Sequence, residues 1–275
     1  MRLLLTLFAI TALLVAPTTA AADHPTRVRP LAQAHAHNDY EHTRPLHDAL
    51  DHGFTSAEAD IYLVGGELLV GHDPQDLVPG RTLRALYLEP LRQRVLDNHG
   101  KVFPGRPFAF QLLIDLKNTG PATYTELDRQ LRDPRYAFLF ARHTDGKLKR
   151  GAVTAVVSGD RPRELMAGQR DRLAFYDGRL VGASDLGGDA TFVPLVSDNW
   201  TKVFTWTGVG PMPAEERSRL RGIVTDAHRA GQRVRFWATP DQPGEQRTAI
   251  WRELAEAGVD HINTDDLAGL AAFLR

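Results

Sequence analysis

The 275-residue sequence contains no cysteine, which excludes a disulfide framework, a thiolate zinc site and a lipid-modified cysteine. It has no excess of either charge, with 33 Lys and Arg against 34 Asp and Glu, so a nucleic-acid partner is not expected. It also lacks the Gly-x-Gly-x-x-Gly and P-loop patterns that bind nucleotide phosphates. Hydrophobic residues make up 43% of the chain, which is enough to build a core without disulfides.

No hydrophobic run is long enough to cross a membrane. The apolar stretch Leu3–Val15, which follows Arg2, is shorter than the ~20 residues that a transmembrane helix needs. Ala20-Ala21-Ala22 then has the small-x-small pattern of a signal peptidase site. We therefore predict a signal peptide over residues 1–22, cleaved near Ala22, and a single domain over residues 23–275. The mature protein is expected to be secreted or periplasmic, monomeric and without a stable membrane anchor.

Strand-like and helix-like stretches alternate from residue 31 onward. Strands are predicted at Leu31–His37, Ser56–Val64, Phe108–Lys117, Ala152–Ser158, Leu173–Tyr176, Phe192–Val196, Val203–Trp206, Val234–Thr239 and His261–Thr264, with a short extra strand at Leu68–Val70. Helices are predicted at Pro45–His52, Glu215–Gly231 and Glu245–Gly258, and after an N-cap at Asp160. This repetition favours a (β/α)8 TIM barrel, with an open doubly wound sheet as the alternative.

Polar side chains gather where the first three predicted strands end. The stretch "AHAHNDY" places His37 and Asn38 at the end of the first strand. Glu58 and Asp60 are two positions apart on the second strand, so they point to the same side of the sheet. The third strand, "FAFQLLIDLK", ends with Asp115 and Lys117. In a (β/α)8 enzyme these strand ends meet at the active site.

Three carboxylates converging inside a barrel predict a bound divalent cation. Each would be costly to bury unless it were paired, protonated or bound to metal. The donors of Glu58, Asp60 and Asp115 are hard oxygens, and Asn38 can add an amide oxygen, so Ca²⁺ or Mg²⁺ is expected rather than Zn²⁺.

Two histidines beside a metal suit phosphodiester chemistry. One imidazole removes a proton from the nucleophile and the other protonates the leaving alkoxide. His37 and His72, the latter in "LLVGHD", are the candidates for this pair. Lys117 supplies a positive charge for the phosphate, and Arg235, in "RFWATPD", either contacts phosphate or pairs with a carboxylate.

These motifs resemble the superfamily of phosphatidylinositol-specific phospholipases C and glycerophosphodiester phosphodiesterases. The resemblance is strongest to the branch that includes the fungal "altered inheritance of mitochondria protein 6", and it rests on "HNDY", "EAD", "GHD", "IDLK", "RFWATPD" and "NTDDL" in this order. It implies a (β/α)8 barrel of the phospholipase C-like phosphodiesterase type. By the same resemblance His37 and His72 are the acid/base pair, and Glu58, Asp60 and Asp115 are metal ligands. Asn38 matches a calcium ligand of the eukaryotic phospholipases C.

The sequence departs from the ordinary glycerophosphodiesterases in several motifs: their Glu-Asn-Thr signature is missing, and their usual Glu-x-Lys of the third strand is Asp-x-Lys here. Their His-Arg-Gly signature is missing, so the phosphate-binding arginine of that branch has no match beside His37. The chemistry is therefore better specified than the substrate, which is expected to be a glycerophosphodiester or a phospholipid head group. Hydrolysis by water and formation of a cyclic phosphate by a substrate hydroxyl both remain open.

Several assignments stay open at this stage. His35 shares a face with His37 and is either the true base or a supporting residue, and Asp39 and Trp237 are candidates for the pocket or its surroundings. Asp265 and Asp266 are candidates for the catalytic face, but Asp266 or Thr264 as the N-cap of the following helix is the simpler interpretation. The alternatives to a phosphodiesterase are a carboxylate-dependent glycoside hydrolase and a non-catalytic barrel that binds metal or glycan.

Overall fold

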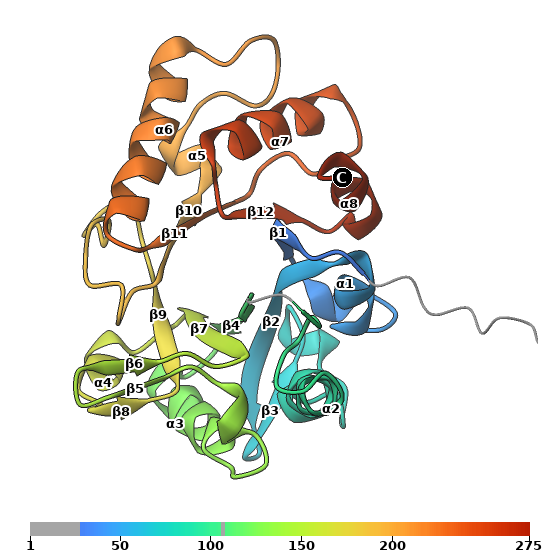
Figure 1. Cartoon of the computed structure of the whole chain (residues 1–275), viewed down its shortest axis with the longest axis vertical. Coiled ribbons are helices and arrows are strands. Elements are labelled where there is room, and N and C mark those ends of the chain that lie inside the picture. The colour runs from blue at the N-terminus through green and yellow to red at the C-terminus, as the bar shows by residue number, and fades with distance from the viewer. Residues whose placement is uncertain (1–27, 106–107) are drawn as a thin grey trace, which may run out of the picture.

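The computed structural model describes residues 28–105 and 108–275, so the predicted signal peptide and its cleavage site lie outside the described residues. Its parallel strands form a ring that closes because β1 pairs with both β12 and β2 (Figure 1). The barrel strands are β1 (Leu31–Ala36), β2 (Phe54–Val64), β4 (Phe110–Leu116), β7 (Val153–Gly159), β9 (Ala174–Gly178), β10 (Leu195–Asn199), β11 (Arg233–Trp237) and β12 (His261–Thr264). The closed parallel barrel that the sequence predicts is confirmed.

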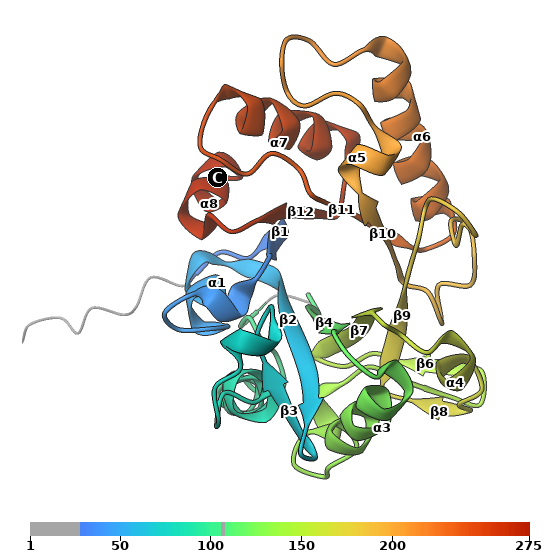
Figure 2. The same ribbon diagram turned by 180° about the vertical axis from the view of Figure 1, so that it is seen from behind.

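Helices surround the ring on its outer side, as both views show (Figures 1 and 2). They are α1 (His47–His52), α2 (Glu89–Asp97), α3 (Gly120–Leu131), α4 (Arg163–Ala167), α5 (Trp200–Val203), α6 (Ala214–Arg229), α7 (Glu245–Ala257) and α8 (Leu267–Phe273). Between β9 and β10 the chain returns through a loop without a helix. None of the helices in the described ranges is long and apolar enough to cross a membrane.

Two short excursions of the chain form strands outside the eight-stranded ring. β3 (Glu67–Val70), predicted as a short extra strand at Leu68–Val70, folds back antiparallel on the far end of β2 and leads into the turn that carries His72. β5 (Arg142–Thr144), β6 (Lys147–Lys149) and β8 (Asp171–Arg172) form a separate small sheet. The first excursion matters for function because it brings His72 to the carboxyl ends of the barrel strands.

The apolar core lies mainly between the strands and the helices, while the barrel interior is largely polar. Alternate residues of each strand face outward; on β2 these are Ala57, Ala59 and Ile61, all buried in the main core. Inside the ring, Leu113, Val156 and Leu195 form a small cluster of their own. The side chains that follow them along the strands toward the carboxyl end are polar, so the interior provides a rigid floor beneath a polar site.

One predicted strand is absent. Residues Val203–Trp206 have the β-branched and aromatic composition of a strand, but Val203 ends the short helix α5 and the next residues extend from it. Asn199 caps this helix by accepting a hydrogen bond from Thr201, and the Trp200 indole donates to the Trp206 carbonyl at 2.7 Å. The aromatic residues are therefore buried by folding back on the helix rather than by pairing in a sheet.

The predicted cap at Asp160 is also wrong. Helix α4 begins only after Pro162 and has no side-chain cap, whereas the Asp160 carboxylate accepts a hydrogen bond from the Gly120 amide at the start of α3, at 2.8 Å. At α8 the structure selects Asp266 from the predicted alternatives: its carboxylate caps the helix by accepting a hydrogen bond from the Gly269 amide at 2.8 Å.

Candidate active site

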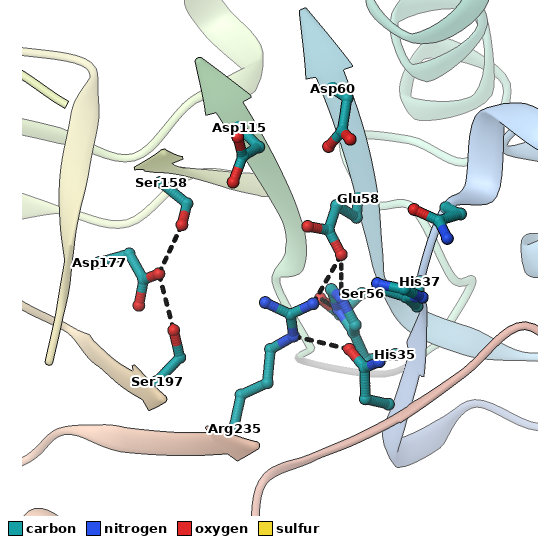
Figure 3. Close-up of polar contacts among 12 residues, drawn as sticks. His35, His37, Ser56, Glu58, Asp60, Asp115, Ser158, Asp177, Ser197 and Arg235 are labelled. Carbon is teal, nitrogen blue, oxygen red and sulfur yellow. Dashed lines mark hydrogen bonds and ion pairs between the residues drawn. The ribbon is translucent and has the colours of Figure 1, made fainter. Parts of the chain in front are cut away.

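A polar cavity of about 180 Å³ opens at the carboxyl ends of the barrel strands. It is lined by His37, Asn38, Glu58, Asp60, His72, Asp115, Lys117, Ser158, Arg179, Arg235 and Trp237. Figure 3 shows several of these side chains converging from neighbouring strands. The structure thus brings together the predicted catalytic, metal-binding and phosphate-binding residues, which come from distant parts of the sequence.

The three predicted metal ligands form one compact cluster. Asp60 on β2 lies beside Asp115 on β4 in the sheet register, and Glu58 lies two residues earlier on the same face of β2. One ligand oxygen from each carboxylate lies within 4.8 Å of the others. Oxygen Oδ1 of Asp60 is buried and has no hydrogen-bond partner among the described residues. A hard cation would satisfy this oxygen, so the donor set fits Ca²⁺ or Mg²⁺.

The pKa values of Asp60 and Asp115 indicate that the neighbouring cations compensate the negative charge of the cluster only in part. Burial and the charges of Glu58 and Asp115 raise the pKa of Asp60 to about 7. Burial likewise raises the pKa of Asp115, although Lys117 opposes this effect. Burial also disfavours the charged form of Glu58, but the charge of Arg235, the hydrogen bond from His35 and the charge of His37 together outweigh it and hold the pKa of Glu58 well below its usual range. A divalent ion would stabilise all three carboxylates in their charged form.

Both predicted phosphate-binding cations already contact carboxylates. Nη2 of Arg235 lies 2.6 Å from Oε2 of Glu58, and Nε donates to the Asn263 amide oxygen at 2.8 Å. The Arg235 side chain is only 3% exposed, so this ion pair is buried. Nζ of Lys117 lies 2.8 Å from Asp60 and 3.4 Å from Asp115. Both cations therefore compensate part of the negative charge of the cluster.

His37 is held in one orientation by Asp265. The residue follows β1, and its Nδ1 lies 2.8 Å from the Asp265 carboxylate, which leaves Nε2 for the cavity. Burial lowers the pKa of His37, but the hydrogen bond to Asp265 and the charge of Glu58 raise it by more, so the net pKa lies above its ordinary value. This is the arrangement of an imidazole that can accept a proton from a nucleophile.

His35 lies below the cavity rather than in it. Its side chain is fully buried, with Nδ1 2.7 Å from the Ser56 hydroxyl and Nε2 3.4 Å from Glu58. Burial and the charge of Arg235 lower the pKa of His35 to about 4. The geometry therefore favours His37 over His35 as the base and makes His35 a support for Glu58.

His72 reaches the same cavity from the turn after β3. Its side chain is 52% exposed, and its Nδ1 lies 3.4 Å from the neighbouring Asp73 carboxylate. The Tyr62 hydroxyl donates to the His72 carbonyl at 3.0 Å and fixes the turn. His72 is thus the more solvated of the two cavity histidines, with 52% of its side chain exposed against 29% for His37, as suits a group that delivers a proton to a departing alkoxide.

Asn38 and Asp39 have different surroundings although they are adjacent. Asn38 adopts a left-handed backbone with φ of 45°, and its amide oxygen lies 2.8 Å from the Tyr40 hydroxyl, which is also 2.8 Å from Asp60. Asp39 is buried outside the cavity, where it accepts hydrogen bonds from the Leu46 amide and the Tyr87 hydroxyl. Asn38 therefore lies in the cavity wall, whereas Asp39 anchors the loop behind it.

Sequence reasoning missed a polar group on the opposite side of the cavity. Asp177 on β9 is fully buried and accepts hydrogen bonds from Ser158 at 2.8 Å and Ser197 at 2.7 Å (Figure 3). Arg179 follows β9 and lines the cavity. The predicted strand ended at Tyr176; continuing its alternation through "FYDGR" would have placed Asp177 and Arg179 on the interior face.

Comparison with known proteins identifies the family of this chain. A family model described as the AIM6-like phosphodiesterase domain matches residues 23–177, and the glycerophosphoryl diester phosphodiesterase family matches residues 233–268. The altered inheritance of mitochondria protein 6 homolog of Arthroderma benhamiae is 30% identical over 85% of this chain and 81% of its own length. The protein of the same name from Eremothecium gossypii is 30% identical over 88% and 69%, respectively.

A solved structure shares the fold. A glycerophosphoryl diester phosphodiesterase from Parabacteroides distasonis superposes with a TM-score of 0.54 and 13% identity, covering 92% of this chain and 88% of that one. At this identity the likeness concerns the fold alone.

The names of the related proteins correct the predicted location. The relatives are named for altered inheritance of mitochondria, which contradicts the expectation of a secreted or periplasmic protein. That expectation rested on residues 1–22, which lie outside the described residues.

The matched family model and the relatives show that this chain belongs to the AIM6-like phosphodiesterase family.

Proposed function

We propose that this protein is a metal-dependent phosphodiesterase that cleaves a glycerophosphodiester or a phospholipid head group. The observation that carries the proposal is the presence of two histidines in one cavity with a compact cluster of three carboxylates. The family supports phosphodiesterase activity, and the residues of the cavity support the dependence on metal and the acid/base roles of the histidines. A metal on the cluster suits a substrate that carries negative charge at the reacting phosphorus.

Glu58, Asp60 and Asp115 would hold one Ca²⁺ or Mg²⁺, with Asn38 as a further oxygen donor. When bound, such an ion polarises the phosphoryl oxygens and lowers the pKa of an attacking hydroxyl. Through their ion pairs, Lys117 opposes the protonation of Asp60, and Arg235 opposes the protonation of Glu58. Their positive charges also favour the phosphate near the cluster.

His37 would remove the proton from the nucleophile. Asp265 binds Nδ1, so Nε2 is the basic nitrogen that faces the reaction, and Asp265 stabilises the imidazolium that forms. His72 would give a proton to the leaving alkoxide. Attack by water yields an open phosphomonoester, and attack by a neighbouring substrate hydroxyl yields a cyclic phosphate; the two histidines serve either route.

The cavity also bears on the substrate. Its volume is about 180 Å³, and its lining consists of charged, amide, hydroxyl and imidazole side chains with Trp237 as the one apolar member. Such a lining accommodates a phosphate and a small polar alcohol but disfavours an acyl chain, which would leave these groups without water or a partner. Any acyl chain of a lipid substrate would therefore remain outside.

The test is turnover by the purified protein on glycerophosphocholine, glycerophosphoethanolamine, glycerophosphoinositol and lysophosphatidylcholine, in Ca²⁺, Mg²⁺ or EDTA. Phosphorus NMR of the products separates open from cyclic phosphates. We expect metal-dependent cleavage that falls by about 10²- to 10⁴-fold in His37→Ala and His72→Ala. His47→Ala, which changes an exposed histidine of α1, is the matched control and should keep full activity. Cleavage that persists in EDTA would contradict the metal role, and cleavage that survives His37→Ala would contradict the base.

A further inference from the structure

Arg179 lies on the side of the barrel opposite His37. The strand order β1-β12-β11-β10-β9 in one direction and β1-β2-β4-β7-β9 in the other places four steps between β1 and β9 either way round. Arg179 follows β9 and lines the same cavity as His37, which follows β1. A group bound between them would therefore occupy the centre of the barrel mouth, beside the carboxylates of β2 and β4.

The Arg179 guanidinium is fixed on one edge only. Its Nη1 lies 2.6 Å from Asp177 Oδ2 and also approaches the Gly178 carbonyl at 3.1 Å and the Ser197 hydroxyl at 3.2 Å. Its Nη2 makes one longer hydrogen bond, 3.2 Å, to the Ser158 hydroxyl. Within residues 28–105 and 108–275, Nε has no hydrogen-bond partner.

Asp177 makes this anchoring rigid. The carboxylate is fully buried and is held by the Ser158 and Ser197 hydroxyls from the two neighbouring strands (Figure 3). The charge of Arg179 compensates the buried carboxylate, and the carboxylate in turn orients the guanidinium. The Nε–Nη2 edge, which is the edge that forms two parallel hydrogen bonds with an oxyanion, is left with spare donors.

The other cations of the cavity do not offer such an edge. Arg235 already uses both Nε and Nη2, for Asn263 and Glu58, and its side chain is only 3% exposed. Lys117 lies between two carboxylates. The Arg179 side chain is 25% exposed and therefore accessible to a ligand in the cavity.

We propose that Arg179 binds the substrate oxyanion through Nε and Nη2 and so takes the place of the phosphate-binding arginine that is missing beside His37. The identity of the anion as a phosphodiester rests on the proposed function, whereas oxyanion binding itself does not. Asp177 is the positioning residue for this contact. An oxyanion bound here is held from the wall opposite the base, which leaves the phosphorus between the two.

The test measures binding of inorganic phosphate and of glycerol 3-phosphate by calorimetry, with Mg²⁺ and with EDTA. Loss of two charge-assisted hydrogen bonds in Arg179→Met should weaken phosphate binding by about 10- to 100-fold. Arg161→Met is the matched control, because Arg161 follows β7 at the same end of the barrel but stacks on Tyr176, with its guanidinium carbon 4.7 Å from the ring centre. It removes the same charge and should change binding by less than about 2-fold.

Each outcome decides the proposal. Phosphate binding by Arg179→Met within 2-fold of wild type, equal losses in Arg179→Met and Arg161→Met, or no phosphate binding by the wild type in either condition would each overturn it. Thermal unfolding shows whether Arg179→Met folds; if it does not, Arg179→Lys retains a charge without the planar edge and should still bind several-fold more weakly. Phosphate binding by Arg179→Lys equal to wild type would refute the two-point contact. Because binding is measured without turnover, an absence of diester cleavage would count against the proposed function and not against this contact.

Discussion

Replacing Arg235 by methionine isolates the buried ion pair in the wall of the cavity. In the folded protein, Arg235 and Glu58 are 3% and 8% exposed and their charged atoms are 2.6 Å apart. Removing one member of a buried pair leaves the other charge uncompensated, which destabilises a protein by about 3–5 kcal/mol. The change also removes the donor to Asn263. We therefore expect Arg235→Met to lose about 3–5 kcal/mol of unfolding free energy in EDTA, a large part of the ~5–15 kcal/mol typical of a domain.

The double variant Arg235→Met/Glu58→Gln shows whether the loss of stability comes from the lost attraction between the two charges or from a Glu58 charge that is buried without a partner. Because both charges are then absent, most of the stability should return, and the coupling energy between the two sites should be at least about 2 kcal/mol. Saturating Mg²⁺ should narrow the gap between Arg235→Met and wild type, since a cation at the cluster compensates Glu58.

Urea unfolding at pH 7.5 measures these differences. Arg44→Met is the control: Arg44 also pairs at 2.7 Å, with Asp48, but it lies on the surface, so its removal should leave stability almost unchanged. An Arg235→Met variant as stable as wild type in EDTA, or a double variant as unstable as the single one, would refute the reasoning.

Three further predictions concern single side chains. Asp265→Asn should reduce kcat about 10-fold, because the carboxylate that holds Nδ1 of His37 is lost. The acid limb of the kcat/KM profile should also move to lower pH, because the pKa of His37 falls without the carboxylate. An unchanged profile would contradict this. Burial and the charge of Arg233 hold the pKa of His261 well below its ordinary value. As the pH falls below about 6.5, His261 is therefore protonated in the unfolded chain but not in the folded one, and the stability of the wild type declines. Relative to wild type, His261→Leu should therefore gain about 2 kcal/mol between pH 7.5 and 5.0, measured by urea unfolding, and an equal pH dependence would refute this. Gly159 has φ of +71°, and a side chain there would collide with the Asp115 carboxylate, so Gly159→Ala should weaken Ca²⁺ or Mg²⁺ binding by about 10-fold or more in calorimetry; wild-type affinity would contradict it.

The barrel and one half of the cavity could be predicted from local pattern. Alternation on β2 is strict, so Glu58 and Asp60 necessarily share a face, and the strand-end position of His37 follows from the same rule. The meeting of these residues with Asp115 follows from parallel strands in register. None of this requires knowledge of the side-chain contacts.

The other half depended on contacts that no local pattern contains. The pairing of Arg235 with Glu58 joins β11 to β2 across the interior, and the sequence could offer it only as one of two alternatives. Asp265 reaches His37 from the opposite end of the chain. Arg179 was missed because the predicted strand stopped before Asp177, where burial of a carboxylate by two serine hydroxyls extends the strand.

The prediction from composition was wrong where tertiary packing, rather than local propensity, determines the backbone conformation. The aromatic and β-branched residues of Val203–Trp206 suit a strand, yet Phe204 packs against Trp200, with ring centres 4.2 Å apart, on the short helix α5. The tertiary contact overrides the local preference. The same holds at Asp160, where a carboxylate that suits the start of its own helix instead binds the start of α3.

The measurement that tests the account most directly is turnover as a function of bound metal. The protein is stripped with EDTA, desalted and titrated with Mg²⁺ or Ca²⁺ while diester cleavage and metal binding are followed together. The account predicts no cleavage without metal and a rate that rises to a plateau at one equivalent in the wild type. Asp115→Asn should neither bind the ion tightly nor recover, while Asp226→Asn, a change at an exposed carboxylate of α6, should behave as wild type. Full cleavage by the metal-free protein, or recovery of Asp115→Asn at one equivalent, would contradict the account.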